Sequence, residues 1–260
     1  MSKVIFEKDG RIGRIILNRP EKLNAIDDDI PNHLEKAVLA AEKDPGIHVV
    51  VLSGNGKAFC GGYDLKAYAE EKGPNNVYQG QNWDPIQDYK FMWNNTQKFM
   101  SLWRCSKPVL CKIHGFAVGG GSDIALCSDL IYMAENAKIG YMSTRVWGCP
   151  STAMWVYRLG AEKAKRVLFT GDQIGGKEAA ALGLVLKSVP ENKLEIYTCT
   201  ANKPVTWSIL PVSGSESVEA DFFTIDSNTG VLKFKSAPDY ENPKDVGKIG
   251  NYDFYIKAED

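Results

Sequence analysis

One stretch of the sequence combines glycines, a carboxylate and an expected helix start in an order that suits catalysis. Gly119, Gly120 and Gly121 follow an apolar run, and Asp123 comes just after them. Glycines at such a turn let a ligand approach bare backbone. Amides at a helix N-terminus are unpaired within the helix and carry the positive end of its dipole, so they suit a developing oxyanion. The stretch is equally typical of an ordinary β–α turn whose aspartate only favours the helix start.

A second glycine-rich segment lies upstream of the first. The short β-branched run His48–Leu52 predicts a strand covered on both faces, and the segment Ser53–Leu65 leads from it into another glycine-bearing loop. Stabilising an enolate or a tetrahedral oxyanion takes two preorganised donors aimed at one oxygen. Two glycine turns in one chain could supply those two donors.

Size and composition exclude several classes of function. The chain has 260 residues, with 31 Lys and Arg against 32 Asp and Glu, so bulk charge does not point to nucleic acid or a membrane surface. No apolar run approaches the length of a bilayer span, and the N-terminus lacks the apolar core of a signal peptide. The six cysteines form no CxxC pair, which suits reduced thiols. These features predict a cytoplasmic protein.

The elements that must position the two turns alternate between strands and helices up to about residue 193. Alternating elements predict an α/β fold with a mostly parallel sheet. The predicted elements include a hairpin of Val4–Glu7 and Ile12–Leu17, helices over Asp27–Lys43 and Phe91–Arg104, two helices split at Gly160, and a surface loop over Glu70–Asp88.

A different composition begins near residue 194. Short alternating strands are broken there by Ser, Gly, Asn and Asp, which is typical of an all-β structure. The sequence therefore predicts two domains, residues 1–193 and residues 194–260.

Residues 1–193 resemble the enoyl-CoA hydratase/isomerase (crotonase) superfamily. The resemblance is carried, in order, by Leu17–Ala25, Gly56–Leu65, His114–Asp123, and Leu168–Asp172 followed by Glu178–Leu184. It implies a ββα spiral core that binds an acyl-CoA thioester, needs no cofactor beyond the coenzyme A of the substrate, and assembles as a homotrimer or hexamer. It also implies that the backbone amides of Tyr63 and Gly120 form an oxyanion hole for the thioester carbonyl.

The resemblance further implies which residues meet the substrate. Family hydratases carry one Glu at the position of Asp123, the expected acid/base, and a second at the position of Ser143. A hydroxyl near its ordinary pKa is a poor general base unless another group activates it, so the type of reaction stays open. For Asp64 a turn or helix N-cap is the favoured role, and Lys22 and Lys57 equally fit solvated surface lysines. The implied substrate-binding residues are Lys22, Asn24, Ala25, Lys57, Ala58, Phe59, Asp64, Leu65 and Gly119.

Residues from about 195 to 260 resemble a cadherin-like repeat. The carrying segments are Val205–Ile209, Phe223–Leu232, Asp239–Pro243 and Tyr255–Asp260. The resemblance implies an Ig-like β-sandwich in which Asp239, Glu241 and Asp260 could bind calcium, because a hard cation prefers oxygen ligands. The same residues fit surface turn charges. The C-terminal helical segment expected of crotonases is replaced by this repeat, which suggests a fusion, a truncated gene product or an engineered, spliced chain.

Two functions are therefore compatible with the sequence. The first is an acyl-CoA enzyme of the hydratase/isomerase type, in which the Tyr63 and Gly120 amides stabilise a thioester enolate and Asp123 is the acid/base. The alternative is a catalytically inactive crotonase scaffold fused to a calcium-binding, cadherin-like adhesion module.

Overall fold

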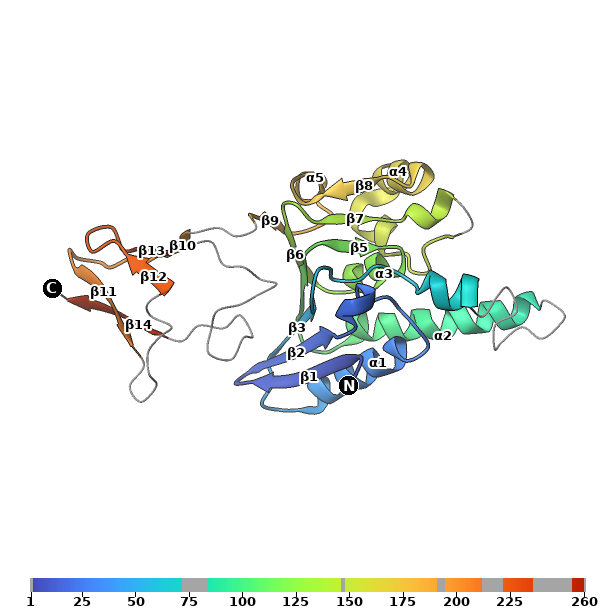
Figure 1. Ribbon diagram of the computed structural model, residues 1–260, viewed down its shortest axis with the longest axis horizontal. Helices are drawn as coiled ribbons and strands as arrows, with labels where there is room; N and C mark the ends of the chain where they lie inside the picture. Colours follow the sequence, from blue (N-terminus) through green and yellow to red (C-terminus); the bar gives the residue numbers. More distant parts are fainter. Residues whose placement is uncertain are drawn as a thin grey trace. The chain divides into compact units, whose positions relative to one another are not determined.

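The computed structural model describes residues 2–71, 84–145, 148–190, 195–211, 222–235 and 254–259 (Figure 1). The chain divides into two compact units, Met1–Val189 and Pro190–Asp260. Within the described ranges, no helix is long and apolar enough to cross a membrane.

The first unit is built on a six-stranded sheet with the order β1-β2-β3-β4-β6-β9. The predicted hairpin is confirmed: β1 (Val4–Asp9) and β2 (Ile12–Leu17) pair antiparallel. All later neighbours are parallel, as predicted. These later strands are β3 (Val49–Gly54), β4 (Val109–Ile113), β6 (Leu130–Ala134) and β9 (Lys187–Val189).

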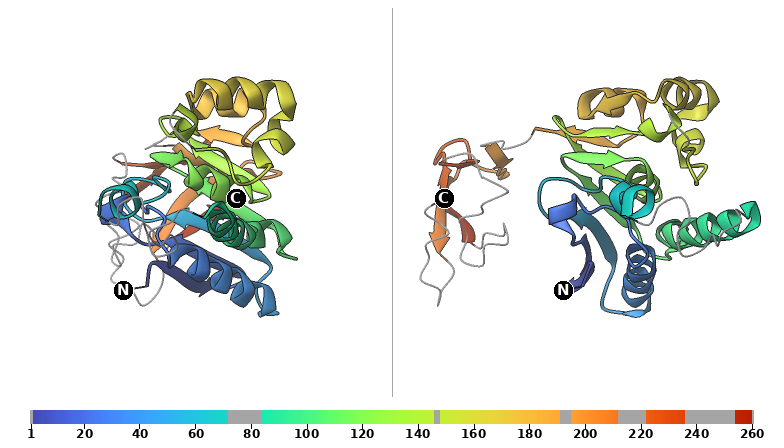
Figure 2. Two further views of the ribbon diagram at one scale, coloured as in Figure 1. Left: turned by 90° about the vertical axis from the view of Figure 1, so that its right-hand side faces the viewer. Right: turned by 45° about the vertical axis from the view of Figure 1, so that its right-hand side comes forward.

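Helix α1 (Ile30–Lys43) packs on the hairpin, and helix α2 (Pro85–Arg104) packs on α1. Helix α1 contacts β1, β2 and α2, and Figure 2 shows α1 and α2 side by side. Ile30, Leu34, Val38 and Ala41 are buried on α1, and their spacing of three to four residues gives the helix one apolar face. The short helices η1 (Pro20–Lys22) and η2 (Lys66–Glu71) lie in the connections.

The predicted start of α2 is wrong. The helix begins at Pro85 and not at Phe91, so the predicted loop over Glu70–Asp88 is too long at its C-terminal end. The Asp84 side chain accepts a hydrogen bond from the Ile86 amide at 2.9 Å, and Pro85 occupies a first-turn position where helices tolerate proline. Residues 72–83 of that predicted loop lie outside the described residues.

A three-stranded sheet of order β5-β7-β8 carries the rest of the first unit. Its strands are β5 (Phe116–Val118), β7 (Lys138–Gly140) and β8 (Gln173–Gly175). The helices of this part, which Figure 1 labels where there is room, are α3 (Gly120–Leu126), η3 (Met142–Arg145), α4 (Met154–Thr170) and α5 (Gly176–Leu182). Gly160 interrupts α4 with φ 73° and ψ 166°, which confirms the predicted split between two helices.

The described part of the second unit contains strands where the sequence predicts them. One sheet has the order β10-β13-β12, and β11 pairs with β14 in another. The strands are β10 (Glu195–Thr198), β11 (Thr206–Pro211), β12 (Phe223–Ile225), β13 (Val231–Phe234) and β14 (Phe254–Glu259). The expected calcium ligands Asp239, Glu241 and Asp260 lie outside the described residues.

Candidate active site

The fold brings the two glycine turns together. Strand β5 runs beside Cys60: the Cys60 amide donates to the Phe116 carbonyl at 2.8 Å, and the Val118 amide donates to the Cys60 carbonyl at 3.1 Å. A Cβ added at Gly62 would lie 2.9 Å from the Val118 carbonyl oxygen. Glycine at position 62 therefore permits the close approach of two segments that are far apart in sequence.

The amides of Tyr63 and Gly120 emerge from these adjacent turns. The Ile26 amide donates to the Gly62 carbonyl at 2.7 Å, and the Asp64 amide donates to the Ile26 carbonyl at 2.9 Å. Because successive amides of an extended strand point to opposite sides, the Tyr63 amide faces away from Ile26. Gly119 precedes Gly120 with φ 54° and ψ −129°, a conformation open mainly to glycine. Among the described residues, no backbone carbonyl accepts from the Tyr63 or Gly120 amide.

The Tyr63 side chain lies against the second turn. A Cβ placed on Gly120 would lie 2.8 Å from a carbon of the Tyr63 ring. The Tyr63 hydroxyl accepts a hydrogen bond from the Asn95 side-chain Nδ2 at 3.4 Å, and the Tyr63 ring meets the Tyr68 ring edge-on with 6.2 Å between the ring centres. Burial raises the pKa of Tyr63 well above its usual range, so the phenol stays neutral.

Asp123 lies in the first turn of α3 and is fully buried. The Thr152 hydroxyl donates to its Oδ1 at 3.0 Å. The Ser151 hydroxyl and amide donate to its Oδ2 at 3.2 and 3.3 Å. Burial raises the pKa of Asp123 to about 7 although these hydrogen bonds act in the opposite direction. A carboxyl that titrates near neutral pH can both accept and release a proton.

Ser143 lies beside the glycine turn. It belongs to η3 and is half-buried. Its Oγ is 3.4 Å from the position that a Cβ on Gly119 would take. The place that the family resemblance assigns to a second carboxylate therefore carries a neutral hydroxyl next to the turn.

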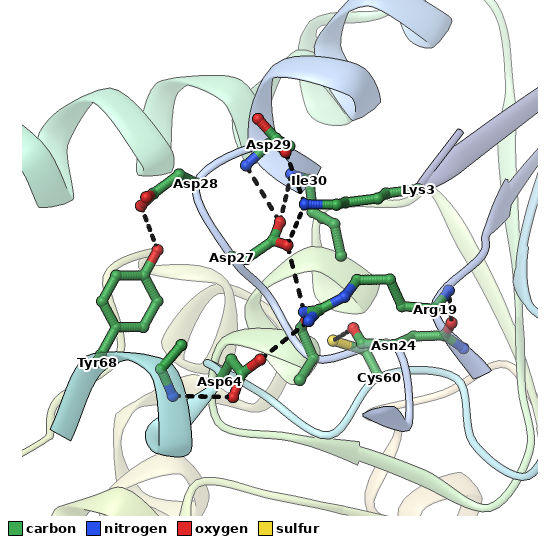
Figure 3. A network of polar contacts seen from close by, with 12 residues as sticks. Lys3, Arg19, Asn24, Asp27, Asp28, Asp29, Ile30, Cys60, Asp64 and Tyr68 are labelled. Atoms are coloured by element: carbon green, nitrogen blue, oxygen red, sulfur yellow. Dashed lines mark hydrogen bonds and ion pairs between the residues drawn. The ribbon is translucent and has the colours of Figure 1, made fainter. Parts of the chain in front are cut away.

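Asn24 and Asp64 both support the loops around the first turn (Figure 3). The Asn24 side chain is fully buried; its Oδ1 accepts from the Arg19 amide at 2.7 Å, and its Nδ2 donates to the Asn55 and Ala58 carbonyls, each at 2.8 Å. The Asp64 carboxylate accepts from the Ala67 amide at 3.2 Å, as a helix cap does, and from the Arg19 guanidinium at 3.0 Å. Contact of either side chain with substrate stays a prediction.

The remaining residues expected at the substrate differ in exposure. Lys22 and Lys57 are exposed, and Leu65 is 57% exposed. Ala58, Phe59 and Gly119 are buried, and Ala25 is half-buried. The Ala58 and Phe59 side chains lie in the interior, so any contact of these two residues with substrate would go through their backbone.

Sequence reasoning missed four residues that the structure brings to this region. Ser151 and Thr152 reach Asp123, Asn95 reaches Tyr63, and Arg19 reaches Asp64. Asn95 also lines a groove of about 160 Å³ between α2 and the chain leading into α1. Nothing in the sequence spacing links these pairs, because each one joins separate elements.

Comparison with known proteins adds independent information. The family model described as enoyl-CoA hydratase/isomerase matches residues 7–206, which extends past the predicted boundary at 193. A probable mitochondrial enoyl-CoA hydratase from Dictyostelium discoideum is 31% identical over 221 residues, covering 83% of this chain and 75% of the relative. The mitochondrial enoyl-CoA hydratase from Pongo abelii is 30% identical over 231 residues, covering 84% and 73%.

A solved structure resembles the chain as well. The crystal structure of an enoyl-CoA hydratase from Mycobacterium smegmatis superposes with a TM-score of 0.66 at 43% sequence identity. The match covers 73% of this chain and 66% of that protein, just under two thirds of its length.

Proposed function

This chain belongs to the enoyl-CoA hydratase/isomerase family, and from that premise we propose that it moves a proton on an acyl-CoA thioester through an enolate. The Tyr63 and Gly120 amides receive the thioester oxygen, and Asp123 is the acid/base. The observation that carries the proposal is that Tyr63 lies against Gly120, whose helix α3 holds the buried Asp123 carboxyl in its first turn, while within the described ranges no backbone carbonyl accepts from either amide. Preorganised donors in a water-excluded site are worth far more than the same donors in water.

The chemistry needs one base and one oxyanion site. The Asp123 carboxylate takes a proton from C2 of a 3-enoyl thioester, and the electron pair of that C–H bond passes into the conjugated dienolate. The two amides stabilise the negative charge that develops on the thioester oxygen. The protonated Asp123 then returns the proton at C4, which gives the 2-enoyl thioester and restores the carboxylate.

A single carboxyl favours double-bond isomerisation over hydration. Hydration must also bind and activate a water molecule, and the position expected for a second carboxylate carries Ser143. A hydroxyl is a weak base without an activating partner. Isomerisation needs no water, so Asp123 suffices for it.

The test compares two reactions in the same preparation. Purified protein is assayed for isomerisation of 3-enoyl-CoA thioesters and for hydration of crotonyl-CoA, with Asp123→Asn as the variant. We expect isomerisation to exceed hydration and to fall about 100-fold or more in the variant. Asp9→Asn is the matched control because the Asp9 carboxylate is 57% exposed and, within the described part of the chain, its one ion pair is with Arg14 on the hairpin. Activity that Asp123→Asn leaves intact would refute the proposal.

For the second unit we propose the cadherin-like sandwich that its sequence resembles. The five described strands in two sheets support the proposal. Calcium should then raise the unfolding temperature of this unit within the whole chain; an unchanged temperature would refute the calcium site and, with it, the adhesion alternative.

Assembly and compartment stay predictions. A homotrimer or hexamer is expected, and its mass can be measured by light scattering. The sequence predicts the cytoplasm, whereas the relatives from D. discoideum and P. abelii are named as mitochondrial enzymes.

A further inference from the structure

Both oxygens of the Asp123 carboxylate accept hydrogen bonds from the segment that leads into α4. Thr152 Oγ1 donates to Oδ1 at 3.0 Å, and Ser151 donates to Oδ2 twice, from its hydroxyl at 3.2 Å and from its amide at 3.3 Å. Thr152 is itself buried, so little solvent competes with Asp123 for its hydroxyl. The arrangement fixes the plane of the carboxyl group as well as its position.

The donors are held in place from both sides. The Tyr141 hydroxyl donates to the Cys149 carbonyl at 2.7 Å, which anchors the segment before Ser151. On the other side, the Arg158 guanidinium of α4 donates to the Leu126 carbonyl at 2.9 Å and also to the Ser128 carbonyl. Arg158 therefore ties α4 to the C-terminal end of α3, the helix that carries Asp123.

We infer that Thr152, supported by Ser151, is a positioning residue that orients the Asp123 carboxylate and favours its ionised form. The catalytic part of this inference rests on the proposed function. The structural part, that Thr152 governs the ionisation of Asp123, stands apart from any activity.

Among the described residues, the ionisable side chains that interact electrostatically with Asp123 are two phenols and a thiol, and burial keeps all three neutral. Tyr63 belongs to the first glycine turn, Cys127 is the C-cap residue of α3, and Tyr141 follows β7. Burial raises the pKa of the Cys127 thiol to about 12 and the pKa of both phenols above their usual range. None of these three groups is a cation, and the effect of burial on the Asp123 pKa is opposed by hydrogen bonds from the Ser151 amide, the Thr152 hydroxyl and the Ser151 hydroxyl.

The test uses a pair of matched variants of the full chain. Thr152→Val keeps the volume of the side chain and removes the donor, whereas Thr152→Ser keeps the donor and removes a methyl group. The ionisation of Asp123 is followed by carbon NMR of protein labelled at the aspartate carboxyls, with Asp123→Asn identifying the resonance. We expect Thr152→Val to raise the Asp123 pKa by about 1–2 units, because a hydrogen bond to a charged acceptor is lost. Thr152→Ser should stay within about half a unit of the parent protein.

The second readout is the pH profile of kcat/KM on the 3-enoyl-CoA thioester. The pH midpoint of its acidic limb should rise in Thr152→Val by the same amount as the Asp123 pKa measured by NMR. In Thr152→Ser the midpoint should equal that of the parent protein. Ser151→Ala keeps the backbone donor and should raise the Asp123 pKa by a smaller amount. This variant replaces Thr152→Val in the test if Thr152→Val fails to fold. An Asp123 pKa that is unchanged in Thr152→Val, or in Ser151→Ala where it stands in, would overturn the inference.

The two proposals can fail separately. A protein without turnover on any thioester, but with the expected NMR shift, refutes the proposed function and supports the structural part of the inference. Turnover that depends on Asp123 but shows no shift in either readout supports the proposed function and overturns the role of Thr152.

Discussion

The Arg19 guanidinium lies 3.0 Å from the Asp64 carboxylate and so joins the loop after β2 to the turn that carries the Tyr63 amide. The same guanidinium lies 3.4 Å from Asp27, which Lys3 also contacts at 2.6 Å (Figure 3). Arg19 also donates to the Ala25 carbonyl at 2.7 Å. The first glycine turn is therefore held by a network of charged side chains from the N-terminal strand and the loop after β2.

Removing the Asp64 charge should destabilise the first unit. In Asp64→Asn, the Arg19 guanidinium loses a partner while both side chains are at most 14% exposed. Arg19 then keeps only its longer contact with Asp27, so its buried charge is less well compensated, and we expect a loss of about 2 kcal/mol in the free energy of unfolding, measured by denaturant titration. Glu178→Gln is the control because its pair with Arg166 is 47% and 61% exposed, and it should change the free energy by less than about 0.5 kcal/mol.

The stabilisation from Asp64 should disappear in acid. Burial raises the pKa of this carboxyl, but hydrogen bonds from the Ala67 amide and Arg19 outweigh it and hold the pKa below its ordinary value. A folded-state pKa below the unfolded one gives stability that is complete above the unfolded pKa and is lost as the pH falls through the folded pKa. The difference between the parent protein and Asp64→Asn should be constant above about pH 5 and shrink below about pH 4. If the difference in the free energy of unfolding between the parent protein and Asp64→Asn did not change with pH, the ion pair would be contradicted.

The close approach at Gly62 gives a direct test of the proposed oxyanion site. In Gly62→Ala the new Cβ would meet the Val118 carbonyl oxygen at 2.9 Å, and the backbone already has φ 89°. The turn must shift and carry the Tyr63 amide with it, so we expect kcat to fall by about 100-fold. Gly183→Ala is the matched control, since Gly183 has φ 81° but no atom within 4 Å of the added Cβ. Equal loss of activity in both variants would show that backbone strain alone is responsible.

The Tyr63 ring should limit the length of the acyl chain. It lies against Gly120 and reaches Asn95 on α2, so it fills space beside the proposed oxyanion site. In Tyr63→Ala we expect the ratio of kcat/KM for an eight-carbon over a four-carbon thioester to rise by about 10-fold or more, because each accommodated methylene adds binding energy. Tyr63→Phe keeps the ring and should keep the preference of the parent protein. A ratio that stays the same in Tyr63→Ala would place the acyl chain elsewhere.

Asp123 should lower stability at neutral and alkaline pH. Its pKa of about 7 in the folded state lies above the ordinary 3.8, so between these values the unfolded chain has released a proton that the folded protein keeps. Stability therefore falls as the pH rises through this window, and the full cost applies above the folded pKa. Asp123→Asn should be more stable than the parent at pH 8, by up to about 4 kcal/mol, and similar to it near pH 4. Thermal unfolding across this range measures the difference, and a variant that is less stable than the parent at pH 8 would contradict it.

The sequence by itself determined the order of elements and the pieces of the candidate site. Alternating apolar runs and glycine turns predicted the hairpin, the parallel sheet and the split at Gly160, because these features depend on local conformation and hydrophobic period. Gly56–Leu65 and His114–Asp123 pointed to the family for the same local reason. The start of α2 was missed because the N-cap residue Asp84 lies in a polar, proline-bearing stretch whose composition is typical of a loop.

Only the tertiary structure decided what surrounds the carboxyl. Ser151 and Thr152 follow Asp123 on a separate segment, and they reach it because β5, β7 and the anchored chain after η3 place α3 against α4. The shift of the Asp123 pKa has the same origin, since burial and hydrogen bonding are sums over atoms from several elements. A residue type and its spacing fix which groups can do chemistry, whereas the protonation state that they hold depends on contacts made only when the chain is folded.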